Sequence, residues 1–328
     1  MIICQLFIFK LNEPMSRLIN GLHHVTALAG GAQKNVDFYG GVLGLRLVKK
    51  TINFDAPDVY HLYYGDGQGS PGSIMTFFPY GQIARGRKGT NQLTYTAFSI
   101  PTAALGFWMD RLTAQHVAFD KPQKRFNETF LRFEDHDGLG IELVANDEDR
   151  RSGWSNGIID PALAIRGFHG VTLHETRGEP TLKLLTDLLE HRVVTETEGR
   201  YRLQAGDGGP GTYVDVIVTP GSLRGLQGAG TVHHVAFSTD SDETQLHIRE
   251  RLAEAGLSVT PVADRNYFHS IYFREPGGVL FEVATNPPGF AIDETPEGLG
   301  AKLMLPEWYE PRRAAIEKGL EPIEVKAF

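Results

Sequence analysis

The chain has 328 residues, of which 41% are hydrophobic and 22% are charged, and its 32 basic and 40 acidic residues give a net charge of −8. This composition is typical of a globular protein and excludes a chain that is disordered as a whole. An acidic chain without a basic stripe is poorly suited to nucleic-acid binding. The length is that of about two domains.

The single cysteine, Cys4, excludes an intramolecular disulfide and any metal site built from several cysteines. No apolar run reaches the ~18–20 residues that a transmembrane helix needs, so no membrane association is expected. The apolar start of the chain lacks the basic region and the cleavage site of a signal peptide. We interpret residues 1–15 as an extension, with Met15 as the preferred natural start, and we expect a cytoplasmic protein.

Four stretches of the chain share one order of predicted elements, which is a strand, an amphipathic helix and then further strands. Alternation of apolar and polar residues predicts the strands, and apolar residues three and four apart predict the helices. In the first stretch the elements fall at 21–28, 35–44, 46–54, 59–66 and 73–79. In the second they fall at 92–100, 103–114, 129–135 and 140–146. In the third they fall at 167–175, 180–191, 192–203 and 212–219, and in the fourth at 231–239, 243–256, 270–276 and 279–286.

Internal similarity supports a repeat. Residues 133–146 align without a gap with residues 273–286, and residues 21–26 align with residues 167–172. The first and third stretches therefore resemble each other, as do the second and fourth. We predict an α+β fold in which four βαβββ modules pair into two open barrel-like cups.

The four predicted modules divide the chain into two halves. We expect an N-terminal domain at 16–150 and a C-terminal domain at 160–290, each with two modules. The polar, glycine-rich segment 150–163 is typical of a linker between them. Residues 291–328 are predicted to form a tail with a short helix.

The opening strands point to a metal site, because equivalent strands of paired modules can direct their side chains at one shared point. At the same position of the opening strand, the four modules carry His24, Tyr95, Gly170 and His234. Near the end of the last strand, the second and fourth modules carry a carboxylate, Glu142 and Glu282.

We predict that His24, His234 and Glu282 bind a metal ion. Two histidines and one carboxylate leave coordination positions open, which suits a non-haem Fe(II) that must bind both a substrate and O₂. Mn(II) is also compatible with these ligands. A set with Glu142 in place of Glu282 has the same chemistry, and we prefer Glu282 because it lies in the same module as His234.

Four further residues are candidates for catalytic roles at this site. His23 and His233 directly precede the two predicted histidine ligands, so we expect them on the opposite strand face as packing or supporting residues. Arg265 and Tyr272 precede Glu282 in the fourth module. These two side chains can orient a phenolate or stabilise developing negative charge.

The chain resembles the vicinal-oxygen-chelate superfamily, which includes glyoxalase I, fosfomycin-resistance proteins and extradiol dioxygenases. Within it, the chain is similar to ring-cleaving dioxygenases related to hydroquinone 1,2-dioxygenases, such as 2,6-dichlorohydroquinone dioxygenase. The segments that carry the resemblance are GLHHVTAL at 21–28, the long run at 48–79, TVHHVAF at 231–237, DRNYFHSIYFREPGGVLFEVATN at 264–286 and the tail at 305–317.

This resemblance implies Fe(II) held by His24, His234 and Glu282, with Arg265 and Tyr272 near the substrate. It implies an enzyme that opens the ring of an aromatic diol by inserting both atoms of O₂, and it favours a hydroquinone as that diol. In catechol-cleaving relatives a histidine of the third module is a ligand instead. Gly170 stands at that position here, which argues against a catechol-type site within the C-terminal half alone.

Two other functions stay open on the sequence. A metal-dependent isomerase or transferase of the glyoxalase or fosfomycin-resistance type would use similar ligands, and a binding module with a degenerate site would need no intact set of ligands. For the preferred function the expected partners are a small aromatic substrate and O₂. Exposed sheet edges and the habit of the family favour a homodimer or a larger homo-oligomer.

Overall fold

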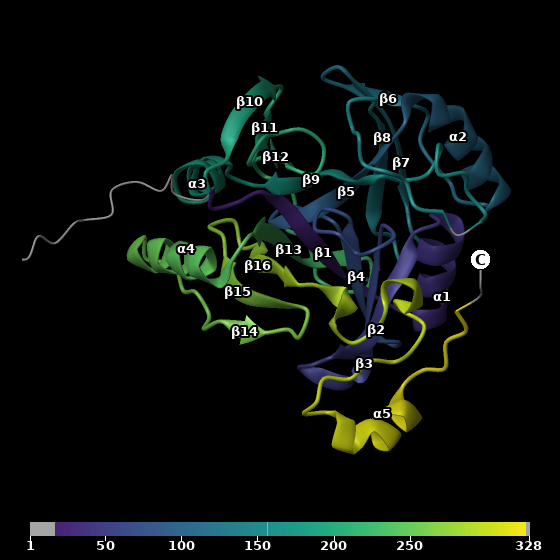
Figure 1. Cartoon of the computed structure of the whole chain (residues 1–328). Coiled ribbons are helices and arrows are strands. Elements are labelled where there is room, and N and C mark those ends of the chain that lie inside the picture. Colours follow the sequence, from purple (N-terminus) through teal and green to yellow (C-terminus); the bar gives the residue numbers. More distant parts are fainter. Residues whose placement is uncertain (1–16, 156, 326–328) are drawn as a thin grey trace, which may run out of the picture.

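A computed structural model describes residues 17–155 and 157–325 and contains two curled eight-stranded sheets with few helices (Figure 1). This architecture confirms the predicted α+β fold of repeated modules. The expected extension at 1–15 lies outside the described residues.

The first sheet has the strand order β14-β15-β16-β13-β1-β4-β3-β2. Its strands are β1 (Gly21–Ala29), β2 (Arg46–Asn53), β3 (Ala56–Gly65), β4 (Ile74–Pro79), β13 (Thr231–Thr239), β14 (Ala263–Asp264), β15 (Phe268–Arg274) and β16 (Leu280–Pro288).

The second sheet has the strand order β10-β11-β12-β9-β5-β8-β7-β6. Its strands are β5 (Gln92–Ile100), β6 (Gln123–Arg125), β7 (Glu128–Glu134), β8 (Gly140–Ala145), β9 (Gly167–Glu175), β10 (Arg192–Thr197), β11 (Arg200–Gln204) and β12 (Tyr213–Val218).

The sheets do not follow the two halves of the sequence. Module 1 (β1–β4) joins module 4 (β13–β16) through the antiparallel pairing of β1 with β13. Module 2 (β5–β8) joins module 3 (β9–β12) through the antiparallel pairing of β5 with β9. Each predicted half, 16–150 and 160–290, therefore contributes one module to each sheet. This arrangement brings the first and fourth opening strands side by side.

Apolar side chains that alternate along the strands pack against helices on one face of each sheet. The helix α2 (Leu105–Ala114) buries Trp108 and Leu112, and α4 (Asp242–Glu254) buries Ile248 and Leu252. Ser241 caps α4, where its side chain accepts a hydrogen bond from the backbone N–H of Thr244.

The remaining helices are short. They are α1 (Ala32–Val36), α3 (Glu179–Lys183) and α5 (Arg313–Gly319), and the first two continue as π-helical turns at Asp37–Val42 and Leu184–Leu188. No helix within the described part of the chain is both long enough and apolar enough to cross a membrane.

The C-terminal segment crosses the outer edge of the first sheet at β2 and β3 (Figure 1). The fully buried Lys49 of β2 forms ion pairs with Asp293 and Glu294, both at 2.6 Å. The hydroxyl of Tyr309 donates a hydrogen bond to the backbone oxygen of Phe54 at 2.9 Å. The Tyr309 contact holds the turn between β2 and β3, and this turn forms part of the wall of a cavity described below.

Candidate metal centre

The three predicted metal ligands lie on neighbouring strands of the first sheet. His24 is in β1, His234 in β13 and Glu282 in β16, and these strands are adjacent in the order β16-β13-β1. Glu282 Oε2 lies 3.3 Å from His24 Nε2 and 3.0 Å from His234 Nε2, and the two Nε2 atoms are 3.2 Å apart. Among the described residues, these three form the only such group of His, Cys, Asp or Glu side chains.

The three donor atoms fit a bound metal ion. Bonds of about 2.0–2.2 Å to imidazole nitrogen and carboxylate oxygen place neighbouring ligand atoms about 3 Å apart, which matches the observed distances. Glu282 is fully buried, and its Oε2 atom has no hydrogen-bond partner among the described residues. An ionised oxygen that is buried without a partner is costly, and a cation between these atoms would remove that cost.

The charge states of Glu282 and His234 also suit a metal. Burial would raise the pKa of Glu282, but the neighbouring His24 and His234 hold it well below its usual range. Burial lowers the pKa of His234. A carboxylate and neutral imidazoles are the forms that bind a metal ion.

A β-bulge places His23 beside His24, against our expectation that it would lie on the opposite face. In the β1–β13 ladder, Leu22 pairs with Phe237 and His24 with Ala236, so His23 is an extra residue in β1. A bulge redirects the side chain of the extra residue. As a result the Nδ1 atoms of His23 and His24 are 2.9 Å apart.

A second bulge on β13 acts in the same way on His233. Thr26 pairs with His234 and Ala27 with Val232, which leaves His233 as the extra residue. Its Nδ1 atom lies 2.8 Å from Nδ1 of His234. The opposite-face prediction was therefore wrong for both histidines, because it assumed an unbroken strand alternation.

The two neighbouring histidines can hold the ligand rings in one orientation. Burial, more than the adjacent ring, lowers the pKa of His23 and that of His233 to about 3, so both are neutral at physiological pH. A neutral ring accepts a hydrogen bond at Nδ1 when its own proton is on Nε2. Each ligand histidine can then donate from Nδ1 and keep the Nε2 lone pair directed at the centre.

Beside the three ligands is a cavity of about 260 Å³. Its wall is largely aromatic, with Phe54, Phe78 and Phe268 among the lining residues. The predicted residues Arg265 and Tyr272 also line it, and Arg265 Nε donates a hydrogen bond to the Tyr272 hydroxyl at 3.1 Å.

The environment sets the protonation of this polar pair. Burial and the charge of Glu282 raise the pKa of Tyr272, so its hydroxyl keeps its proton at neutral pH. Arg265 lies 3.3 Å from Asp55 Oδ2 at the cavity wall. The cavity therefore combines an aromatic wall with the Arg265 guanidinium and the Tyr272 hydroxyl.

Sequence reasoning did not find Ser270, and it left His61 open as either a core or a cavity histidine. Ser270 donates a hydrogen bond to Glu282 Oε1 at 2.5 Å and so fixes the carboxylate. His61 lines the cavity and bonds the hydroxyl groups of Tyr63 and Thr76, both at 2.8 Å. No spacing in the sequence marks Ser270, which lies on β15 beside the strand that carries Glu282.

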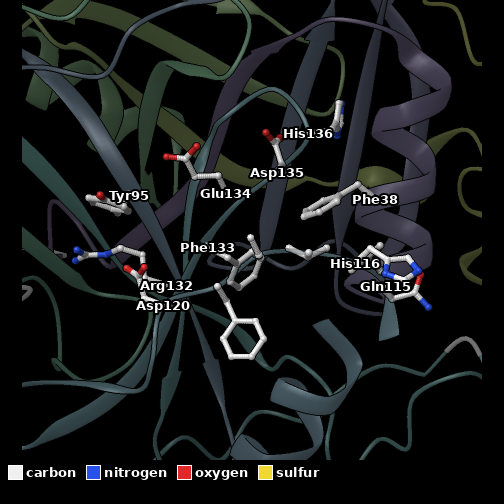
Figure 2. A pocket seen from close by; sticks show the side chains of 14 residues that line it. Phe38, Tyr95, Gln115, His116, Asp120, Arg132, Phe133, Glu134, Asp135 and His136 are labelled. Carbon is white, nitrogen blue, oxygen red and sulfur yellow. The ribbon is translucent and has the colours of Figure 1, made fainter. Parts of the chain in front are cut away.

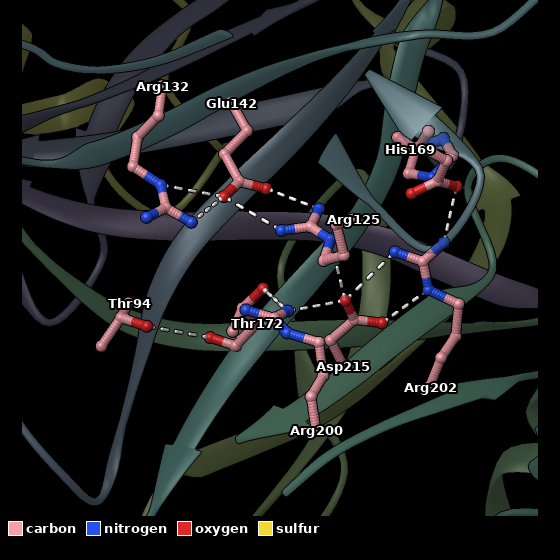
Figure 3. A network of polar contacts seen from close by, with 10 residues as sticks. Thr94, Arg125, Arg132, Glu142, His169, Thr172, Arg200, Arg202 and Asp215 are labelled. Carbon is pink, nitrogen blue, oxygen red and sulfur yellow. Dashed lines mark hydrogen bonds and ion pairs between the residues drawn. The ribbon is translucent and has the colours of Figure 1, made fainter. Parts of the chain in front are cut away.

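Glu142, the alternative carboxylate, lies in the second sheet and is bound by two arginines (Figure 3). Arg125 and Arg132 each donate two hydrogen bonds to it, at 2.7 and 3.1 Å. Its pKa is lowered because these guanidinium groups outweigh the effect of burial. The structure therefore gives Glu142 a place in an ion-pair network and not beside His24 and His234.

The network continues across the second cup, which is the one formed by the second sheet. It includes Glu142, the residue that corresponds to Glu282 of the candidate metal centre. Asp215 accepts hydrogen bonds from Arg200 at 2.7 Å and from Arg202 at 2.7 and 3.1 Å (Figure 3). Arg202 also pairs with Glu128 at 2.6 Å, and Glu128 lies 2.7 Å from His169 Nε2. The same bulges recur here, since Thr94 and His169 are the extra residues in the β5–β9 ladder.

A larger cavity of about 710 Å³ lies beside the second cup (Figure 2), and none of the three ligands lines it. Tyr95, Arg132 and Phe38 are among its lining residues. Tyr95 stands at the position of His234 in the repeat, and its ring lies under the Arg132 guanidinium, 4.2 Å from ring centre to Cζ. The larger of these two cavities is therefore not the one beside the three candidate ligands.

Comparison with known proteins extends these observations. The chain is 48% identical over 314 residues to MhqO of Bacillus subtilis (strain 168), provisionally named a ring-cleaving dioxygenase, with 95% of this chain and 99% of that protein covered. It is 35% identical over 296 residues to the chlorohydroquinone/hydroquinone 1,2-dioxygenase of Sphingobium indicum, with 88% and 91% covered.

Solved structures agree with the fold. A crystal structure from Bacillus subtilis subsp. subtilis str. 168, provisionally described as a dioxygenase, superposes with a TM-score of 0.91 at 45% identity and covers 95% of this chain and 99% of its own. Glyoxalase I from Zea mays, at 14% identity and a TM-score of 0.63 over 81% of this chain and 92% of its own, shares the fold alone.

The family match covers residues 21–143 and 171–283, which include His24, His234 and Glu282. The chain therefore belongs to the Glyoxalase/Bleomycin resistance protein/Dioxygenase superfamily.

Proposed function

We propose that the protein is an Fe(II)-dependent ring-cleaving dioxygenase that opens a hydroquinone by inserting both atoms of O₂. The convergence of His24, His234 and Glu282 beside an aromatic cavity carries this proposal. Two histidines and one carboxylate with open positions are typical of non-haem Fe(II) oxygenases. The names of the relatives support the choice of reaction and of substrate class.

The cavity suits one aromatic ring. An apolar cavity of about 150 Å³ is large enough to hold benzene, so about 260 Å³ accommodates a single ring with substituents. The aromatic side chains Phe54, Phe78 and Phe268 provide flat surfaces against which a ring can pack. A bicyclic substrate would need the wall to move.

When bound, Fe(II) would favour the ionised hydroxyl of the substrate and allow O₂ to react with the ring. Arg265 and Tyr272 have a complementary task. The Arg265 guanidinium fixes the Tyr272 hydroxyl oxygen, which leaves the phenol proton free to donate to an oxygen in the cavity. Both groups would stabilise negative charge that develops on the substrate.

The direct test is oxygen uptake by protein purified without oxygen and reconstituted with Fe(II) or Mn(II). Hydroquinone, a chlorinated or methylated hydroquinone and catechol are the substrates to compare. We expect uptake of one O₂ per ring opened with the para-diols. His234→Ala and Glu282→Gln should lose both the bound metal and the oxygen uptake.

A matched control is Glu142→Gln, which changes the equivalent carboxylate of the second cup and leaves the three ligands intact. This variant should keep its metal and its activity per folded molecule. Bound metal without oxygen uptake from any diol would overturn the dioxygenase proposal and favour a glyoxalase-type isomerase or transferase. Full activity in Glu282→Gln would refute the proposed site.

A further inference from the structure

Two glutamates that the proposed metal centre does not use are buried together where modules 3 and 4 meet. Glu175 is the last residue of β9, and Glu275 lies in the turn between β15 and β16. Glu175 is 0% exposed and Glu275 is 2% exposed. A Cβ atom placed on Gly277 would lie 2.1 Å from Glu175 Oε2 and 2.6 Å from Glu275 Oε1, so the two carboxylates converge on the space that this glycine leaves open.

The two side chains differ in their hydrogen bonds. Glu275 Oε1 accepts from the backbone N–H of Val279 at 2.9 Å, and Glu275 Oε2 accepts from the Thr181 hydroxyl at 2.6 Å. Neither oxygen of Glu175 has a hydrogen-bond partner among the described residues. Glu275 thus has two hydrogen-bond donors, whereas Glu175 has none among the described residues.

The nearest basic groups do not neutralise the pair. Arg274 donates to the backbone oxygen of Gly278 at 2.8 Å, and the Arg224 guanidinium lies 3.4 Å from where a Gly278 Cβ would be. In the described ranges neither arginine forms an ion pair with Glu175 or Glu275, and Glu275 is the one charged group that acts on Glu175.

The other titratable groups on the surrounding elements are also engaged elsewhere. His174 precedes Glu175 on β9, and its Nε2 atom bonds the Thr219 hydroxyl. Glu179 and Lys183 of α3 pair with each other at the surface, 3.2 Å apart. Within the described part of the chain, the Glu175–Glu275 pair therefore has no counter-ion from the elements packed around it.

We propose that Glu175 and Glu275 share one proton, with Glu175 as the carboxylic acid, and that this pair is a pH-sensitive joint between modules 3 and 4. A protonated Glu175 can donate to Glu275, which then stabilises its single charge with the donors from Thr181 and Val279. Two charges in this dry position would repel each other without solvent to screen them.

The electrostatics agree with this assignment and give the direction of the pH effect. Burial, followed by the charge of Glu275, raises the pKa of Glu175 from 4.5 to about 8. Because the folded protein holds a proton that the unfolded chain releases, the free energy of unfolding falls as pH rises between these two values. The contribution of the pair to the free energy of unfolding is full below about pH 4.5 and is lost above about pH 8.

The test is thermal unfolding of the intact protein between pH 6 and pH 9.5. Glu175→Gln keeps the shape and the donor of the neutral acid but cannot ionise. We expect its Tm to exceed that of the wild type by a margin that grows from pH 6 to about pH 8 and then stays constant. Glu250→Gln, on the exposed face of α4, is the control and should keep the wild-type pH profile.

Two results would overturn the proposal. In the first, Glu175→Gln is less stable than the wild type at every pH, and added Ca²⁺ or K⁺ raises the Tm of the wild type. This pattern would mean that Glu175 is ionised and binds a cation. If the variant does not fold, the infrared spectrum of the wild type decides. A carboxylic acid band that disappears between pH 7 and pH 9.5 supports the shared proton, and its absence at pH 7 refutes it.

Discussion

Glu142 and Glu282 occupy equivalent positions in the repeat, and replacing each by glutamine should affect different properties of the protein. Glu142 is fully buried and accepts four hydrogen bonds from Arg125 and Arg132 at 2.7–3.1 Å. Glutamine keeps the volume, but it removes the charge and turns an NH₂ group toward a guanidinium. Removing one partner of a buried ion pair costs about 3–5 kcal/mol because the other charge stays buried without compensation. We expect Glu142→Gln to lower the free energy of unfolding by that amount.

Urea unfolding of the metal-free protein at one pH measures this difference, with metal content determined on the same preparations. Glu142→Gln should unfold at a lower urea concentration and still bind metal when folded. Glu282→Gln removes a carboxylate oxygen that has no hydrogen-bond partner among the described residues, so its main effect should be loss of metal. A Glu142→Gln variant with wild-type stability and reduced metal content would refute this reasoning, because Glu142 would then act on the metal centre.

Two further predictions concern the metal centre. Ser270→Ala removes the donor 2.5 Å from Glu282 Oε1 and should weaken metal binding about 10–100-fold, as measured by competition with a chelator. As a control, Ser238→Ala removes a hydroxyl of β13 that donates a hydrogen bond to Asn286 of β16, and it should keep the wild-type metal affinity. Equal losses of affinity in the two variants would contradict a specific role for Ser270. The loaded protein should contain one metal ion per chain by elemental analysis, because Tyr95 and Gly170 replace the histidines in the second cup. A chelator should lower its Tm, since a ligand that binds the folded state stabilises it, and two ions per chain would contradict this assignment.

The fold and the three candidate ligands could be predicted because a repeat compares positions within one chain. His24 and His234 stand at the same position of the opening strand of their modules as Tyr95 and Gly170 do in theirs. This difference in residue type marks the two histidines without any other information. The strand alternation then predicts which side chains share a face.

The remaining features depend on contacts that alternation does not encode. The positions of His23 and His233 follow from bulges in the β1–β13 ladder. One extra residue in a strand is enough to put a side chain on the other sheet face from the one that alternation predicts. The pairing of modules 1 and 4 depends on which strand edges meet, and both the sequential and the observed pairing satisfy the same apolar pattern. Phe54 reaches the cavity because Tyr309, far along the chain, holds its backbone.

The pairing of modules also determines the order in which the protein can be completed during its synthesis. Modules 2 and 3 are neighbours in the chain, so the arginine-rich cup can close while the ribosome is still producing module 4. His24 and His234 are 210 residues apart, and Glu282 is translated later still. Module 1 must therefore wait, with the edge of β1 unpaired, until the last module arrives. The three candidate ligands therefore come together only after most of the chain has been made, so a nascent chain cannot complete this group before its fold is nearly finished.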